Sequence, residues 1–436
     1  MAGQDTSSYD AVLKDLYEGA IRDQVVTNAK MYRRFQDKDA KLWGGRQVTY
    51  PIRTGRNQGV GAYAEGGSFP TPGRNAYTNV SIPMRYVGGR IRLTSQAMKH
   101  SQSSKGAFAS AFQQEQDGLV EGITNEFGRM IWSDGRGVLG LVNGDPGTGT
   151  TVTVDSPGGF AGATNGTRFI NVGELVTFVT PATGALVASA DETVTAVAAT
   201  GLTFTTGSAV AAAIADNDYI VRAHVASVSD ISGTSYAKEP MGLAGLVDDG
   251  TYVATLHGVN RTTYPIYAST VIGSTTAPVG ALSSDVIMRG IDLADERGGG
   301  NIDLLAMHHS VRRAYIQLTD EGRRYQGGDL SRPDAGTVAA RGRNLTFGGI
   351  DIEVDKYATY GTLYGLDTST LVRFVEVPGE WVADDGAILR PVGVGATFTD
   401  EWEAAYRVWQ NFHNEYPNKS FRLDGVTSNI VVAHID

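Results

Sequence analysis

The sequence predicts an α+β fold that combines a long extended hairpin, a single long helix and an inserted all-β domain. Three observations support this fold class. Residues 44–92 alternate polar and apolar residues as strands do. Residues 105–133 repeat apolar residues at helical spacing, and residues 147–226 carry short strand patterns separated by turn signals.

The hairpin region, residues 44–92, contains ten glycines, seven arginines, one acidic residue (Glu65) and no lysine. Two alternating runs, Val48–Ile52 and Val80–Met84, suit a two-stranded hairpin with one half-buried face. An isolated hairpin is marginally stable in water, so this one needs a surface to lie on. We expect that surface to come from another copy of the chain, which indicates an assembling, structural protein.

Composition excludes several classes of protein. The chain has 436 residues and no cysteine, which rules out disulfides and cysteine metal sites. Its 55 glycines show no Gly-X-Y period, so they mark turns rather than a fibre. The N-terminus lacks an apolar signal segment, and no apolar run approaches the length of about 20 residues that a membrane span needs. We therefore expect a soluble protein made in the cytoplasm, without membrane contact.

Charge is unevenly distributed along a chain whose net charge is -10. Residues 1–105 carry 16 basic and 8 acidic residues, whereas residues 145–235 carry two basic and eight acidic ones. Two surfaces with different partners would explain this asymmetry. Scattered, solvated charge is the alternative.

The N-terminal segment, residues 8–41, reads as a helix or broken helix whose second half is basic. Bases and aromatics interleave at residues 30–35, a pattern that can contact phosphates and bases of a nucleic acid. An amphipathic helix with a solvated basic face explains the pattern equally well. The candidate DNA-facing residues are Lys30, Arg33, Arg34 and Lys38.

The remaining two hundred residues predict a mixed α+β region. Helices are expected at Ser283–Arg297, between a serine cap and a glycine run, and at Ser310–Tyr325, with a buried strand, Ile302–Met307, between them. Residues 400–416 fit a strand and a helix about equally. Further strands are expected at Leu345–Asp355, Thr362–Leu366, Leu371–Val377 and Ala387–Val392.

Motifs that would indicate catalysis are weak. The GxGxxG match at residues 135–140 follows a helix and precedes a β-rich segment, so it predicts a turn rather than a dinucleotide site. His308 and His309 are adjacent and face different directions, and residues 216–218 lack the later ligands of a calcium loop. No nucleophile elbow or phosphate loop is present. We predict no catalytic residue, no cofactor and no metal.

The order of elements resembles tailed-bacteriophage major capsid proteins, which have the Hong Kong 97-type fold. The late segments carry the resemblance furthest: Phe347–Asp355, Leu363–Asp367, and Trp381 ahead of Asp384-Asp385-Gly386. Residues 242–247 followed by residues 261–265 also look like that family. The resemblance covers nearly the whole chain except 147–226.

The resemblance implies a division of the chain and a function. Its parts would be an N-terminal arm (1–43), an extended hairpin loop over a neighbouring subunit (44–92), a peripheral domain with a spine helix (93–146), an inserted β-rich domain (147–226), an axial domain (227–345) and a return to the peripheral domain (346–436). Copies would form hexamers and pentamers, close an icosahedral shell and enclose packaged double-stranded DNA. The virion capsid, assembled in the host cytoplasm, would be its location.

Partners and contacts follow from the same resemblance. With 43 residues ahead of the loop, a separate scaffolding protein is expected, together with a portal and a candidate cement protein. The loop lacks the lysine that one family member uses for a covalent cross-link, so the shell should be non-covalent. The predicted intersubunit loop contacts are Arg53, Arg56, Arg74 and Arg85. Within the fold the alternative is an encapsulin-like shell protein with enzyme cargo; outside it, a soluble hydrolase or dinucleotide enzyme.

Overall fold

The structure is a computed structural model, and it describes residues 30–39, 47–96, 105–160, 165–187, 191–225, 228–274, 277–323, 345–383, 386–392 and 399–427. Most of the N-terminal segment predicted as a helix lies outside these residues. The part that is described differs from the prediction. A 3-10 turn, η1 (Met31–Arg34), leads into strand β1 (Gln36–Asp39), which pairs in parallel with β18.

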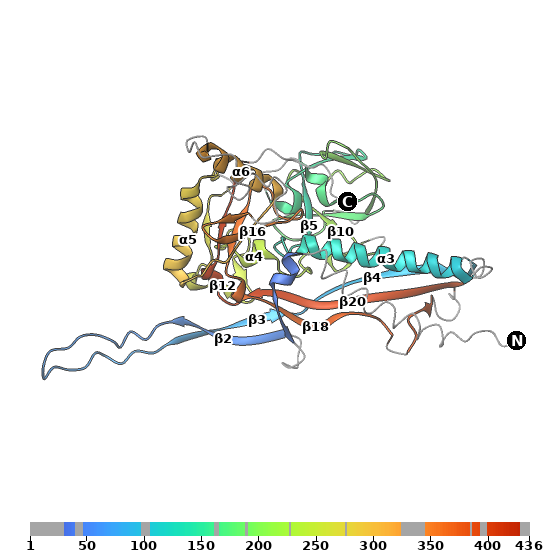
Figure 1. Cartoon of the computed structure of the whole chain (residues 1–436). Coiled ribbons are helices and arrows are strands. Elements are labelled where there is room, and N and C mark those ends of the chain that lie inside the picture. The colour runs from blue at the N-terminus through green and yellow to red at the C-terminus, as the bar shows by residue number, and fades with distance from the viewer. Residues whose placement is uncertain are drawn as a thin grey trace.

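A five-stranded sheet and one long helix form an elongated half of the molecule (Figure 1). Helix α3 (Lys105–Met130) runs along strand β4 and buries Val120, Ile123 and Phe127 against the sheet. The segment 400–416, which fitted a strand and a helix equally, is a strand, β20 (Glu401–Asn414). Its side chains alternate between buried and half-buried. The strands are β1, β18 (Leu371–Trp381), β20 (Glu401–Asn414), β19 (Arg390–Pro391) and β4 (Arg85–Thr94).

A six-stranded sheet with two helices forms the second half. Helix α5 (Ser284–Gly298) begins where the hydroxyl of Ser283 accepts a hydrogen bond from the Val286 N–H, and it ends at Gly299 with φ 61°. Helix α6 is His309–Arg323. Both predicted helices and the buried strand between them are confirmed. The strand order is β13 (Thr270–Ile272), β21 (Phe421–Leu423), β17 (Leu363–Leu366), β14 (Leu304–Met307), β16 (Ile350–Val354) and β15 (Thr346–Phe347).

Residues after 346 therefore do not all return to the five-stranded sheet. Strand β16 pairs in parallel with β14, and β17 pairs antiparallel with both β14 and β21. These strands have four or five residues and are buried or half-buried between their neighbours, so they belong to the six-stranded sheet. Among the described strands of this region, β18, β19 and β20 join the five-stranded sheet.

The inserted domain is a closed six-stranded barrel with order β10-β5-β6-β9-β8-β7. Its interior is filled by apolar side chains such as Val152, Val176 and Phe204. The barrel begins with β5, ahead of the predicted start at residue 147, because β5 pairs with both β10 and β6. Its strands are β5 (Val138–Val142), β6 (Thr151–Asp155), β7 (Leu175–Val179), β8 (Glu192–Val197), β9 (Thr203–Thr206) and β10 (Tyr219–Arg222).

Strands β2 (Gln47–Gly55) and β3 (Ala76–Pro83) form the predicted hairpin, which projects from the body as a two-stranded ribbon (Figure 1). It ends earlier than predicted. Residues 85–94 form β4 and pair with β20 over ten positions, so they belong to the five-stranded sheet.

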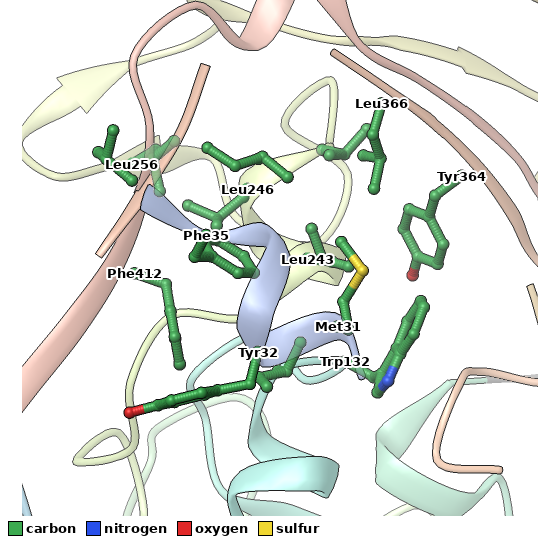
Figure 2. Close-up of a cluster of buried hydrophobic side chains, with 14 of the residues drawn as sticks. Met31, Tyr32, Phe35, Trp132, Leu243, Leu246, Leu256, Tyr364, Leu366 and Phe412 are labelled. Carbon is green, nitrogen blue, oxygen red and sulfur yellow. The ribbon is translucent and has the colours of Figure 1, made fainter. Parts of the chain in front are cut away.

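The main core lies where the two halves meet, and the N-terminal segment is part of it. Met31, Tyr32 and Phe35 are buried beside Trp132 at the end of α3 and Phe412 of β20 (Figure 2). Shorter elements line this region and its connections: α4 (Leu243–Leu246), β11 (Thr255–Leu256), β12 (Val259–Asn260), η3 (Pro157–Gly159), η4 (Gly166–Phe169), η5 (Ile231–Gly233), η6 (Pro265–Tyr267), η7 (Thr368–Thr370) and η9 (Pro417–Lys419).

Candidate assembly surfaces

The root of the hairpin is fixed to the main core. Val48, Val80 and Ile82 are almost completely buried there. The Ser81 N–H donates to the His257 carbonyl at 2.8 Å, and the Asn411 side-chain amide donates to the Pro83 carbonyl at 2.8 Å. Because apolar burial and hydrogen bonds hold both strands, the direction in which the hairpin projects is set by the fold.

The distal part of the hairpin is exposed and apolar. Val60 is 75% exposed, Tyr63 55% and Phe69 76%, and the ring centroids of Tyr63 and Phe69 lie 4.6 Å apart. A turn closes the tip, where the Gly67 N–H donates to the Ala64 carbonyl at 2.8 Å. An exposed aromatic pair on a projecting ribbon is typical of a protein–protein contact.

The four predicted loop arginines divide into two groups. Arg53, Arg56 and Arg74 are exposed, and none of them forms an ion pair within the part of the chain that the structure describes. Arg85 lies at the start of β4, where its guanidinium donates to the Ala237 carbonyl at 2.9 Å. Burial lowers the pKa of Arg85. Arg85 thus contacts its own chain, and the other three lie on the projecting surface.

The exposed face of α3 has the opposite charge. Glu115, Asp117 and Glu121 are exposed, and among the described side chains from 115 to 128 no basic residue accompanies them. Gly118 and Gly122 lie on the same face, with open space where a Cβ atom would be. This face is therefore acidic and notched.

A cleft of about 410 Å³ lies beside that face, between α3, β4 and the barrel. Its walls combine glycines with apolar side chains, and its polar side holds a cluster of charged groups. Residues that line it include Gly88, Gly89, Leu119, Gly122, Ile123 and Glu239.

The charged cluster links three parts of the chain. Glu126 of α3 pairs with Arg222 of the barrel at 2.8 Å and with Arg129 at 3.0 Å. Arg129 also pairs with Glu239, and Arg222 with Glu174. Burial alone would raise the pKa of Glu126, but the two arginines outweigh it and lower that pKa to about 2. The cluster holds the barrel against α3.

Three members of this cluster each have one buried atom without a hydrogen-bond partner among the described residues: Glu239 Oε2, Arg129 Nη1 and Arg222 Nε. Burial raises the pKa of Glu239 despite the opposing effect of Arg129. No sequence pattern predicted this cluster, because residues 126 and 222 are 96 positions apart.

The candidate DNA-facing bases also divide into two groups. Arg34 pairs with Glu353 at 2.8 Å, and Lys38 pairs with Glu415. Lys30 and Arg33 are exposed, next to the buried Met31 and Tyr32. The fold thus uses Arg34 and Lys38 to attach the N-terminal segment, and Arg33 has an interaction of its own.

The motifs considered for catalysis in the sequence have structural roles in the fold. Gly135 and Gly137 adopt positive φ values of 80° and 75° in the turn that connects α3 to the barrel. His308 is buried and hydrogen-bonded to Ser310 at 2.9 Å. No group of three or more potential metal ligands occurs within the described ranges. Likewise, none of the helices in these ranges is both long and apolar enough to cross a membrane.

The comparisons with known proteins give different results for the sequence and for the structure. No protein-family model and no curated protein matches the sequence. The structure is similar to a chain of the cyanophage A-1(L) capsid asymmetric unit, with 10% identity, 92% of this chain and 93% of that chain covered, and a TM-score of 0.54. Other similar chains come from the capsid of a native GTA particle (8%, 92% and 90%, TM-score 0.45) and from the capsid of Myoviridae phage XM1 (9%, 91% and 90%, TM-score 0.41).

The chain therefore has the fold of a phage capsid chain. The predicted resemblance to phage capsid proteins is confirmed at the level of the fold.

Proposed function

We propose that this chain is the major capsid protein of a tailed phage and that its copies assemble into an icosahedral shell. The observation that carries the proposal is the hairpin, which is rooted in the core at Val80 and Ile82 and exposes Tyr63 and Phe69 at its far end. The chain that carries this hairpin has a fold similar to that of a cyanophage capsid chain. The chain would act through assembly, and the proposal assigns it no catalytic group, cofactor or metal.

The Hong Kong 97-type organisation fits the elements observed. In this proposal the hairpin β2–β3 is the extended loop and α3 is the spine helix of a peripheral domain built on the five-stranded sheet. The six-stranded sheet with α5 and α6 would be the axial domain. A projecting loop that contacts a different surface on the next copy makes a heterologous contact, which closes into rings such as hexamers and pentamers when the rotation between copies completes a full turn.

Packaged double-stranded DNA is the proposed content of the shell. With a net charge of -10, an average surface of this chain would repel phosphates, so basic residues should lie where DNA is contacted. The exposed Lys30 is the member of the predicted set that supports this role best, and Arg33 is exposed close to it. Their contact with DNA would be independent of base sequence and sensitive to salt.

The test uses the hairpin charges. Purified protein is imaged by negative stain, and the triple variant Arg53→Glu, Arg56→Glu, Arg74→Glu is compared with the charge-retaining variant in which the same residues become lysine. We expect shells from wild type and the lysine variant and few or none from the glutamate variant. Monomer melting should be similar in all three, since exposed charges contribute little to stability. Wild-type protein that forms neither shells nor rings of subunits, or shells from the glutamate variant, would contradict the proposal.

A further inference from the structure

We propose that a small cavity between the barrel, the end of α3 and the connection from β16 to β17 binds a single monovalent anion of the size of chloride, with Arg168 as its main ligand. The cavity is lined from the barrel by Arg168 and Phe169, from α3 by Arg129, and from the connection by Tyr357. All of these groups belong to one chain. The inference therefore goes beyond the proposed function and does not depend on assembly.

Arg168 is a buried cation without a counter-ion. Its side chain is almost completely buried, and it forms no ion pair within the part of the chain that the structure describes. Its Nη1 and Nη2 atoms donate to the carbonyls of Ala358 and Lys356, whereas its Nε atom has no hydrogen-bond partner among the described residues. Burial lowers the pKa of Arg168 to about 10, so the group still carries its charge at neutral pH. Buried charges are normally paired, because a charge that loses its hydration is costly unless another group compensates it.

The neighbouring carboxylates do not provide the missing partner. Asp355 acts on Arg168 electrostatically but forms no ion pair with it, and burial raises the pKa of Asp355. Glu126 and Glu239 are both engaged by Arg129. Arg129 is itself buried, and its Nη1 atom has no hydrogen-bond partner among the described residues. Two buried arginines that line one cavity thus each have an N–H group without an acceptor.

The chemistry of these two groups favours an anion over a water molecule. An arginine N–H group only donates, so both unpartnered atoms need an acceptor. A water molecule would accept from them, but its own O–H groups would need acceptors in turn, and the charge of Arg168 would stay uncompensated. A halide ion accepts from both arginines, requires no acceptor and neutralises the charge. Hydrogen bonds between ionised groups are also the stronger ones.

The size of the cavity restricts the anion to a small one. The centre of a water-sized sphere can occupy about 10 Å³ of it, which is enough for one water molecule or one halide ion. Sulfate and phosphate are too large for this space. The rings of Phe160 and Phe169 form part of the wall, and such an apolar surface suits a weakly hydrated ion. Chloride and bromide meet both conditions.

Urea unfolding of the full chain as unassembled subunits provides the first test. Sodium chloride replaces sodium gluconate at constant ionic strength, so that general screening stays the same. An ion that binds the folded chain alone stabilises it by mass action, so chloride at ten times its dissociation constant should lower the unfolding equilibrium constant about elevenfold. Bromide should act like chloride, and sulfate no more than gluconate. The variant Arg168→Met should lose the response, whereas Arg313→Met, which removes an exposed arginine of α6, should keep it.

Crystals of the wild-type chain grown in sodium bromide provide the second test, which does not depend on whether Arg168→Met folds. We expect an anomalous bromide peak in the cavity, within hydrogen-bond distance of Arg168 Nε.

Several results would overturn the inference. A cavity that holds only water in bromide would do so, as would a wild-type stability that is the same in chloride and gluconate. A bromide peak without any stabilisation would identify an adventitious ion only. A folded Arg168→Met chain that keeps the chloride response would also rule out Arg168 as the ligand. None of these results bears on shell formation, so the proposed function is tested separately.

Discussion

The Nδ1 atom of His257 lies 2.9 Å from the Nδ1 atom of His413, and the other ring nitrogen of His413 lies 2.5 Å from the hydroxyl of Tyr50. These three side chains connect the turn between β11 and β12, the central strand β20 and the root of the hairpin. Only an unprotonated Nδ1 can accept a hydrogen bond, so at least one of the two rings must be neutral. The hairpin root therefore depends on the protonation state of a buried histidine pair.

Acid should destabilise the folded chain through this pair. Burial, with Arg261 and Arg85 nearby, lowers the pKa of His257 to about 3, and burial lowers the pKa of His413 well below 6.5, with His257 and Lys38 adding to the effect. Below pH 6.5 the unfolded chain binds more protons at these positions than the folded chain does. The free energy of unfolding should thus fall as pH drops from 6.5 toward 3, by at most about 1.4 kcal/mol per pH unit for each histidine.

Urea unfolding of monomers at several pH values between 7 and 4 measures this slope. The variant His413→Gln should be less stable at pH 7 but show a shallower pH dependence, since one depressed group is removed. His224→Gln is the comparison: burial, with Lys238 and Arg222 nearby, lowers the pKa of His224 too, but its side chain is exposed, so its loss should flatten the slope less than the loss of His413 does. A His413→Gln slope equal to that of wild type would show that the pair does not govern acid stability.

Arg168 should matter more to stability than any surface arginine. It is 1% exposed, its guanidinium donates to the carbonyls of Ala358 and Lys356, and it lies 4.3 Å from the ring centroid of Tyr360. These contacts join the barrel to the connection between β16 and β17. Replacing Arg168 with Met leaves two carbonyls without their donor, at a cost of about 2–4 kcal/mol.

Thermal or urea unfolding checks this expectation. The control, Arg313→Met, removes an exposed arginine of α6 and should change the free energy of unfolding by no more than about 0.5 kcal/mol. An effect of Arg168→Met as small as that of Arg313→Met would mean that these contacts do not couple the barrel to the body.

Local patterns predicted local structure well. The caps of α5, Ser283 and Gly299, mark both of its ends, and alternation identified the two strands of the hairpin. Alternation could not show where the hairpin ends, because residues 85–94 alternate in the same way while pairing with β20. Segment 400–416 also carries aromatics at helical spacing, and only the neighbouring strands β4 and β18 make it a strand.

Contacts between residues that are far apart along the chain could not be predicted from sequence patterns. The histidine pair joins positions 156 residues apart, and no local pattern distinguishes a histidine with such a partner from any other. The same holds for Arg85, whose spacing grouped it with the hairpin arginines although its guanidinium contacts Ala237. Which face of a strand meets which partner is decided by tertiary packing.

Shells of this chain should be held together without covalent bonds. The described hairpin contains no lysine, and the chain has no cysteine. Particles boiled in detergent should give a single band near 46.3 kDa. The measurement is a denaturing gel with and without reductant, and a ladder of multimers under both conditions would contradict the prediction.

The two groups of N-terminal bases should behave differently when they are neutralised. Arg34 and Lys38 are engaged with Glu353 and Glu415, so changing both to glutamine removes two partly exposed ion pairs. Each such pair typically contributes about 0–1 kcal/mol, so stability should fall slightly. Changing the exposed Lys30 and Arg33 to glutamine should lower stability no more than this and should weaken retention of DNA in native particles.

The ratio of DNA to protein in purified particles, followed over a salt series, distinguishes these effects. Phosphate contacts act by counterion release, so DNA retention by wild type should decline with salt more steeply than retention by the variant that lacks Lys30 and Arg33. The Arg34 and Lys38 variant is the matched control, because it removes the same number of positive charges from the same segment. If both variants lose DNA equally, net charge rather than position is responsible; if neither does, the N-terminal segment does not line the packaged DNA.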